Sequence, residues 1–406
     1  MVYYHTTAWK IVTTGLFTLF ILFLFVLTLE FVLRTTHLFG AKITWTSPDP
    51  TLGYTFLPGR EYWCRSENDH PITGRINSHG WRDTERSLTK PENTYRIAVL
   101  GDSFVEALQV EREATFLALA ENQLSAVTGH SVEIMNFGRS GYSQTEEFLV
   151  LKNHVTKFSP NLVLLFFFPG NDIADVDKRT AVNSQRPFFS LSESGELTLD
   201  SSFSRTQEFK LRSFVSWFRQ HSAFISLLSD RYVIYRAVRA ETLSQRHHET
   251  STGKLQGYLG LCTSSPGGVF LQNYKLTKQL IAAMAEHCEL NKIRLMLICC
   301  NVYYSLELEK EYRQIDQTFN PNFFEDDLKE YARSINIEYL GLQRIFRQAS
   351  IETGFPYHWR SGGHWNYQGH RLVARSLVDR LKVSIRNEVS PQQALGYHAD
   401  SALLRR

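Results

Sequence analysis

The chain has 406 residues, enough for one large α/β domain with additional segments. Its 44 Lys and Arg against 41 Asp and Glu give a formal net charge of +3. That balance argues neither for a nucleic-acid partner nor for a strongly acidic one. With 43% hydrophobic and 21% charged residues, the composition predicts a folded chain rather than a disordered one.

The amino-terminal region is the first predicted element. Residues 11–33 read IVTTGLFTLFILFLFVLTLEFVL, and residues 11–29 carry no charge. At 1.5 Å per residue, such a helix spans a hydrocarbon core of about 30 Å. A cleaved signal has a shorter apolar region of roughly 7–15 residues, followed by small residues, whereas bulky Phe and Leu fill that region here. We therefore predict a transmembrane anchor at 11–33, preceded by a short tail at 1–10.

The orientation of this anchor rests on few charges. Lys10 and the amino group precede the predicted helix, and Arg34 follows it. This bias is too small to apply the positive-inside rule with force. We favour the amino terminus in the cytoplasm and the large domain outside it, in the periplasm or the extracellular space.

The segment that follows, 34–93, has no long helical period. We interpret it as a linking segment with a possible small β hairpin, which the alternating sequence GRINSHGWRDTER (74–86) favours. Five cysteines lie along the chain without metal-ligand spacing: Cys64, Cys262, Cys288, Cys299 and Cys300. A Cys64–Cys262 disulfide is conceivable, although an odd number of cysteines indicates no disulfide framework.

From residue 94 to 386, apolar runs alternate with helical patterns. Strands are predicted at 96–100, 132–137, 161–168, 294–302 and 337–342, and helices at 113–127, 145–158, 271–291, 322–336 and 366–383. Strands that are apolar throughout are buried on both faces, so the pattern predicts a mainly parallel sheet in a three-layer α/β sandwich. An insertion of about 174–268, expected to be largely helical, interrupts this pattern, and residues 387–406 form a polar tail.

Polar motifs follow three of the predicted strands, and a fourth precedes the last helix. They are GDSF (101–104), NFGRSGYSQ (136–144), FPGNDIADV (168–176) and SGGHWNYQGH (361–370). In an open α/β sheet, ligands bind beyond the carboxyl ends of the strands, so the first three motifs should converge there.

The residue types in these motifs suit acyl transfer. Ser103 is the candidate nucleophile and His364 the candidate base, since a serine hydroxyl needs a base within hydrogen-bond reach. The N–H groups of Ser103 and Gly141 and the amide of Asn171 can form an oxyanion hole. Asp102 fits best as a structural hydrogen-bonding residue beneath the serine turn. This chemistry implies no metal ion and no organic cofactor.

With these four blocks in this order, the chain resembles the SGNH (GDSL-type) hydrolases. The resemblance covers roughly residues 95–385 and rests on Ser103, Gly141, Asn171 and His364. It implies the flavodoxin-like fold of that family, preceded here by one transmembrane helix as in membrane-anchored bacterial members.

One position departs from the family pattern. The family usually places Asp three residues before the catalytic His, and this chain has Ser361 there. That aspartate orients the imidazole and stabilises its protonated form. Ser361 can accept a hydrogen bond but brings no charge, and Asp175 or Glu352 are alternatives that the sequence leaves open.

The sequence therefore favours a membrane-anchored serine esterase that hydrolyses or transfers an acyl group through a Ser–His acyl-enzyme. The substrate is expected to be an acyl ester of a glycan or a lipid. A polysaccharide O-acetyltransferase and a catalytically inactive glycan-binding module are the alternatives. The sequence predicts no nucleic-acid partner and leaves the oligomeric state open.

Overall fold

A computed structural model describes residues 2–40, 42–192, 194–232, 235, 254–266, 268–301, 306–360 and 363–389. The chain falls into two compact units. One consists of Met1–Pro48 and Gln207–Ser251, and the other of Asp49–Thr206 and Thr252–Arg406. The second contains all four motifs singled out from the sequence.

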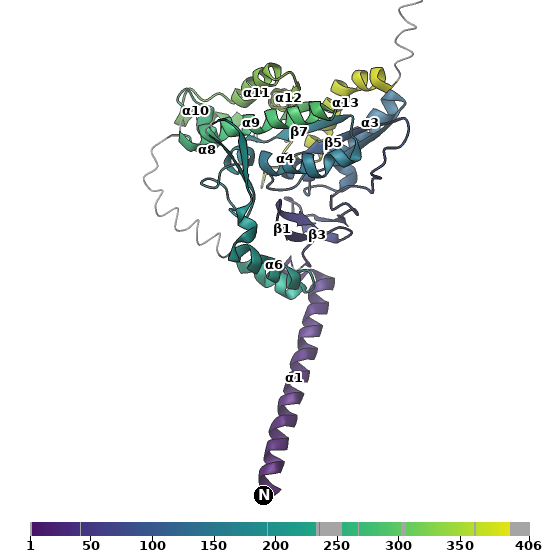
Figure 1. Ribbon diagram of the computed structural model, residues 1–406, viewed down its shortest axis with the longest axis vertical. Helices are drawn as coiled ribbons and strands as arrows, with labels where there is room; N and C mark the ends of the chain where they lie inside the picture. Colours follow the sequence, from purple (N-terminus) through teal and green to yellow (C-terminus); the bar gives the residue numbers. More distant parts are fainter. Residues whose placement is uncertain are drawn as a thin grey trace, which may run out of the picture. The chain divides into compact units, whose positions relative to one another are not determined.

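A five-stranded parallel sheet forms the centre of the second unit, in the spatial order β11-β10-β7-β5-β6. Figure 1 labels two of its strands, β5 and β7. Its strands are β5 (Thr94–Leu100), β6 (Ser131–Asn136), β7 (Leu162–Phe167), β10 (Arg294–Cys299) and β11 (Glu338–Gly341). The sequence places all five correctly. In chain order they read 5-4-3-1-2, so the direction of winding reverses between β5 and β7.

Helices cover both faces of the sheet, as the uniformly apolar strands predict. Ile97 and Val99 of β5 face a core with α3 (Phe116–Thr128), α12 (Gln343–Thr353) and α13 (Tyr367–Val389). Ala98 and Leu100 face the opposite core, with α4 (Gln144–Asn153), α9 (Gly268–Leu290) and α11 (Phe323–Ser334). The predicted three-layer sandwich is confirmed, with α10 (Leu306–Ile315) and α12 added to the predicted helices.

The segment at 49–93 is an integral part of this unit. It contains β2 (Gly53–Phe56) and a hairpin of β3 (Glu61–Arg65) and β4 (Pro71–Arg75). The sequence favoured a hairpin at 74–86, but the observed hairpin lies earlier in the chain. The polar turn at 66–70 connects its two strands. Arg82 is buried and donates to the carbonyls of Glu106, Ala107 and Val110, at 2.7–3.0 Å.

The insertion divides between the two units. Its first part forms an antiparallel pair of β8 (Phe188–Leu191) and β9 (Leu197–Asp200) rather than helix. Its second part contains α6 (Gln207–Arg219), which belongs to the unit of α1 (Val2–Thr36). The α1 helix is long and apolar enough to cross a membrane over Trp9–Thr36.

The five cysteines are all free and buried, so the conceivable Cys64–Cys262 disulfide is absent. Cys64 Sγ lies against the carbonyls of Ile72 and Leu108, whereas Cys262 Sγ lies against that of Tyr258. Burial raises the pKa of the Cys262 and Cys288 thiols to about 12. They act as packing residues. The predicted polar tail lies almost wholly outside the described residues.

Candidate active site

Ser103 lies at the carboxyl end of β5, at the first position of the short helix α2 (Ser103–Glu106). Asp102 caps this helix, because its Oδ1 accepts a hydrogen bond of 2.9 Å from the Phe104 N–H. A Cβ on Gly101 would lie 2.4 Å from Val105 Cγ2, so the tight strand-to-helix turn requires glycine. The predicted glycine, acid and hydroxyl thus build one turn that presents the serine.

His364 contacts this serine directly. Its Nε2 lies 2.7 Å from Ser103 Oγ, a distance suited to proton transfer. The loop carrying the histidine is fixed by the bond from Trp359 N–H to the His364 carbonyl, at 2.8 Å. The neighbouring Trp365 is buried and donates its indole N–H to Asn301 Oδ1 at 2.9 Å. The imidazole therefore sits on a loop anchored to the sheet edge.

Two further histidines lie nearby and have structural roles. His358 Nε2 accepts from the Asn301 amide at 2.9 Å, and burial lowers its pKa to about 3. His370 accepts from the Phe116 N–H at 3.3 Å, and burial likewise lowers its pKa to about 3. Both rings stay neutral near neutral pH. Of these histidines, only His364 contacts the serine hydroxyl.

Glu67 is the acidic partner of His364. The Nδ1–H of the imidazole donates to Glu67 Oε1, and the His364 backbone N–H lies 3.3 Å from Oε2. Glu67 lies in the turn between β3 and β4, where Ser66 N–H donates to the His70 carbonyl at 2.8 Å. The two side chains are 16% and 22% exposed for Glu67 and His364, respectively. Ser103, His364 and Glu67 form a continuous hydrogen-bonded chain.

The acidic partners considered from the sequence have other neighbours. Asp175 Oδ2 is paired with Arg186 at 2.9 Å, and Glu352 accepts from Gln348 at 2.6 Å. Ser361 lies outside the described residues. Sequence reasoning missed Glu67 because it lies almost 300 residues before His364, in a turn without a motif. The one sequence signal for that turn is the run of polar residues at 66–70, which predicts a turn but not a contact with His364.

The predicted oxyanion donors follow the first three strands. Gly141 has φ +75°, a conformation that favours glycine, and a Cβ there would lie 3.1 Å from Tyr54 Oη. Asn171 Nδ2 donates to the Tyr142 carbonyl at 2.7 Å, which places its amide against the Gly141 segment. The Ser103 N–H lies in the first turn of α2, where amides lack intrahelical acceptors. Gly141 and Asn171 are thus brought together beyond the ends of β6 and β7, the two strands that flank β5.

Buried carboxyl groups support the floor of the site. Burial raises the pKa of Asp102 to about 6, against the Phe104 hydrogen bond and the His364 charge, which lower it. Burial and the Asp102 charge raise the pKa of Asp172 well above its usual value. Asp172 Oδ2 accepts from the Phe168 N–H at 2.7 Å and from Gln144 at 3.0 Å. These contacts fix the turn that carries Asn171.

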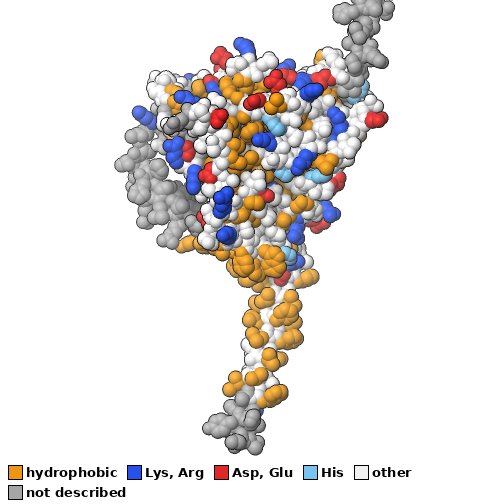
Figure 2. Space-filling model, viewed as in Figure 1, with side chains coloured by type: hydrophobic (Ala, Val, Ile, Leu, Met, Phe, Trp, Pro, Cys, Tyr) orange, Lys and Arg blue, Asp and Glu red, His pale blue; other side chains and the backbone are white. Residues whose placement is uncertain are grey.

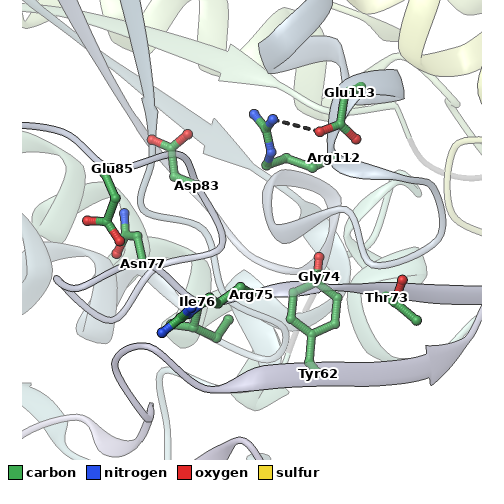
Figure 3. A pocket seen from close by; sticks show the side chains of 10 residues that line it. All are labelled: Tyr62, Thr73, Gly74, Arg75, Ile76, Asn77, Asp83, Glu85, Arg112 and Glu113. Atoms are coloured by element: carbon green, nitrogen blue, oxygen red, sulfur yellow. Dashed lines mark hydrogen bonds and ion pairs between the residues drawn. The ribbon is translucent and has the colours of Figure 1, made fainter.

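A separate polar cavity of about 350 Å³ lies beside the β3–β4 hairpin (Figure 3). Its lining includes Tyr62, Arg75, Glu85 and the ion pair Arg112–Glu113, but neither Ser103 nor His364. Glu85 accepts from Ser78 N–H at 2.9 Å, and Arg75 donates to the Gly59 carbonyl at 3.0 Å. Because these charged groups already have protein partners, the cavity gives no indication of a ligand.

A comparison with solved structures found esterases and lipolytic proteins among the chains that are similar to this one. Similar solved structures include a protein assigned to the lipolytic G-D-S-L family of Desulfitobacterium hafniense (13% identity, TM-score 0.34, covering 70% of this chain and 98% of that one). Another is an acetylxylan esterase of Geobacillus stearothermophilus (13% identity, TM-score 0.38, covering 70% of this chain and 93% of that one). A third is a GDSL-like lipase of Bacteroides thetaiotaomicron (12% identity, TM-score 0.33, covering 71% of this chain and 88% of that one).

No family model and no curated relative matches the sequence. The structural likenesses have low identity and low TM-scores, so the chemistry has to come from the residues of this chain. Those residues are Ser103, His364 and Glu67, with Gly141 and Asn171 beside them.

Proposed function

We propose that this protein is a membrane-anchored serine esterase acting through a Ser103–His364–Glu67 triad. The observation that carries the proposal is the continuous chain from Ser103 Oγ through both imidazole nitrogens to a carboxylate. The three residues come from separate parts of the sequence, and each lies on a turn fixed by its own hydrogen bonds. The same hydrogen-bonded arrangement, from nucleophile to base to acid, recurs in serine hydrolases on unrelated folds.

In the first half-reaction, Ser103 Oγ attacks the ester carbonyl carbon and His364 Nε2 takes the hydroxyl proton. The resulting imidazolium donates its Nδ1–H to Glu67, whose charge stabilises it. When the tetrahedral intermediate collapses, the proton passes from Nε2 to the leaving alkoxide, and an acyl-serine remains. In the second half-reaction, His364 Nε2 takes a proton from water as the water oxygen attacks the acyl carbon. The bond from that carbon to Ser103 Oγ then breaks, Nε2 returns the proton to Oγ, and the free acid leaves.

The developing oxyanion requires donors that are already in place. The N–H groups of Ser103 and Gly141 and the Asn171 amide are the proposed donors. Asn171 already donates one hydrogen to the Tyr142 carbonyl, and this bond fixes the plane of its amide. Its second N–H is the one proposed to reach the substrate oxygen. A fixed donor costs little reorganisation as charge develops.

The α1 helix supports placement at a membrane. We propose that it spans the bilayer once, with the catalytic unit outside the cytoplasm. An enzyme held there meets lipids and envelope glycans, so the proposed substrate is an acyl ester of a glycan or a lipid. A reporter fused after residue 406 tests the orientation, since activity of a reporter that works only in the cytoplasm would reverse the proposed placement.

The inactive glycan-binding alternative was motivated by Ser361, which brings no charge to the histidine. Glu67 removes that motivation, because a carboxylate lies at the imidazole from another part of the chain. Transfer of the acyl group to a sugar hydroxyl would use the same acyl-enzyme as hydrolysis. The products separate these two outcomes, since hydrolysis releases free acid and transfer yields an acylated glycan.

Labelling by a fluorophosphonate probe tests the proposed nucleophile. The full-length protein in detergent should be labelled at one serine, identified as Ser103 by mass spectrometry of its peptides. A Ser103→Ala variant should neither be labelled nor hydrolyse p-nitrophenyl acetate. Ser140→Ala is the matched control, because this serine lies in the neighbouring loop and its hydroxyl has no proposed role. Unchanged ester turnover by Ser103→Ala would refute the proposal.

A further inference from the structure

The unit that contains α1 also exposes an apolar surface on the inserted helix α6. Leu211, Phe214 and Trp217 are 62%, 64% and 59% exposed. The helical residues 223–232 continue this surface with Leu228, which is also exposed. Figure 2 shows hydrophobic side chains along α1 and on the helices near its end. Large apolar side chains grouped on a surface mark an interaction site.

These residues form one stripe along α6. At 3.6 residues per turn, Leu211, Phe214 and Phe218 lie above one another, and Trp217 lies beside them. Phe209 is buried on a different face of the helix, whereas the side chains of the stripe remain largely exposed. The helix thus presents a second apolar side in addition to its buried one.

Basic residues accompany the stripe. Lys210 and Arg212 are exposed on α6, whereas Arg219 at the end of the helix is paired with Asp230 at 2.6 Å. Glu208 is the one acidic residue among the thirteen of α6. A helix with an apolar stripe that carries Trp and Phe, and with Lys and Arg beside it, is typical of the boundary between headgroups and acyl chains.

The turn after α6 is bonded to α1. Glu30 of α1 accepts hydrogen bonds from Ala223 N–H at 2.7 Å, Ser222 Oγ at 2.9 Å and Phe224 N–H at 3.1 Å. Arg34 donates to the His221 carbonyl at 2.5 Å. Leu33 and Ala223 are both buried in the small core between these elements. The end of α6 therefore lies at the level of residues 30–34 of α1.

The length of α1 fixes the depth of that level. Lys10 and Glu30 are the first and the next charged residues of the helix. The twenty residue steps from Lys10 to Glu30 rise about 30 Å, the thickness of a hydrocarbon core. If Lys10 lies at one boundary of the bilayer, Glu30 lies at the other. The turn at 221–224, and Trp217 one turn before it, then lie at that second boundary.

We propose that the exposed stripe of α6 inserts into the interfacial layer of the same bilayer that α1 crosses. The proposal rests on the membrane anchoring proposed above and adds a second, monotopic contact. Lipid is the occupant because the turn that follows the stripe is bonded to α1 at the depth where the span ends, and because Lys210 and Arg212 are exposed on the same helix. The inserted helices would hold α1 through Glu30 and Arg34, so the anchor and the interfacial helix act as one rigid membrane-bound element.

Site-specific fluorescence in lipid vesicles tests this contact. The full-length protein carries an environment-sensitive maleimide dye at Phe214→Cys, at Arg212→Cys on the other side of α6, or at Phe20→Cys in the middle of α1. The five native cysteines are buried, so the dye reports the introduced one. The vesicles contain phosphatidylcholine and phosphatidylglycerol, with nitroxide-labelled lipid either near the headgroup or near the chain end. Aqueous iodide probes access from water.

We expect the dye at 214 to be quenched by the shallow nitroxide and protected from iodide, and the dye at 212 to show the reverse. The dye at 20 should be quenched by the deep nitroxide. Iodide quenching at 214 equal to that at 212, with deep quenching at 20, would overturn the interfacial contact and leave the anchor in place. Protection at 214 from both quenchers would overturn it in favour of a second copy of the chain. Iodide access at 20 would overturn both proposals. A second label at Leu211→Cys guards against a local effect at 214.

Discussion

Replacement of Glu67 by glutamine removes the negative charge at His364 and keeps the size of the side chain. The pair is less than a quarter exposed, so an effective dielectric constant of about 20 applies. At a separation of charge centres of roughly 4 Å, the carboxylate then stabilises the imidazolium by about 4 kcal/mol. Since about 1.4 kcal/mol corresponds to a factor of ten, kcat should fall on the order of 10³-fold.

The assay is hydrolysis of p-nitrophenyl acetate by the full-length protein in detergent, with kcat and KM measured separately. KM should change little, because Glu67 acts through His364 and the charge it stabilises forms only during the reaction. Labelling by the fluorophosphonate probe should slow in parallel. The melting temperature should stay close to that of the unchanged protein, which separates a positioning role from a structural one.

Asp69→Asn is the matched control, because Asp69 lies in the same turn, and its ion pair with Arg65 is largely exposed. This variant should keep full activity. Ser361→Ala should also keep activity if Glu67 supplies the charge. A Glu67→Gln enzyme within about threefold of the unchanged kcat, where 4 kcal/mol predicts 10³-fold, would refute the reasoning.

Three further perturbations test other parts of the site and its support. Asn171→Ala should lower kcat by about 10²–10³-fold through loss of an oxyanion donor, and an unchanged kcat would exclude that role. Asp102 has its pKa raised from 3.8 to about 6, so the folded state binds more protons and stability falls as pH rises between these values. Between pH values of about 4 and 7, the free energy of unfolding should fall by about 3 kcal/mol less in Asp102→Asn than in the unchanged protein, as chemical unfolding measures. An equal fall in the two proteins would contradict the assignment. Arg186→Met should destabilise the fold by about 3–5 kcal/mol, because it leaves Glu146 and Asp175 buried without their cation, and thermal melting measures this loss.

The α/β fold follows from short-range patterns that a sequence displays directly. Residues 162–167 are all apolar and form a strand that is buried throughout, which only a sheet covered on both faces accommodates. The turns at Gly101 and Gly141 can likewise be predicted from the sequence, because a tight turn or a close backbone contact accepts few residues other than glycine. The exact position of the β3–β4 hairpin could not be predicted from the sequence, because several short polar segments could each have formed its turn.

The sequence by itself determined which residues are the candidate nucleophile, base and oxyanion donors, because each follows or precedes a core element whose position the topology dictates. Ser103, Gly141 and Asn171 follow strands of one parallel sheet, and such strand ends share an edge. Only the tertiary structure shows which carboxylate contacts His364. Glu67 reaches His364 only because the β3–β4 hairpin folds onto the sheet unit, a long-range contact between residues with no shared periodicity or motif. The contact between α1 and the turn after α6 was likewise unpredictable, because Glu30 and Ala223 are nearly 200 residues apart and share no motif.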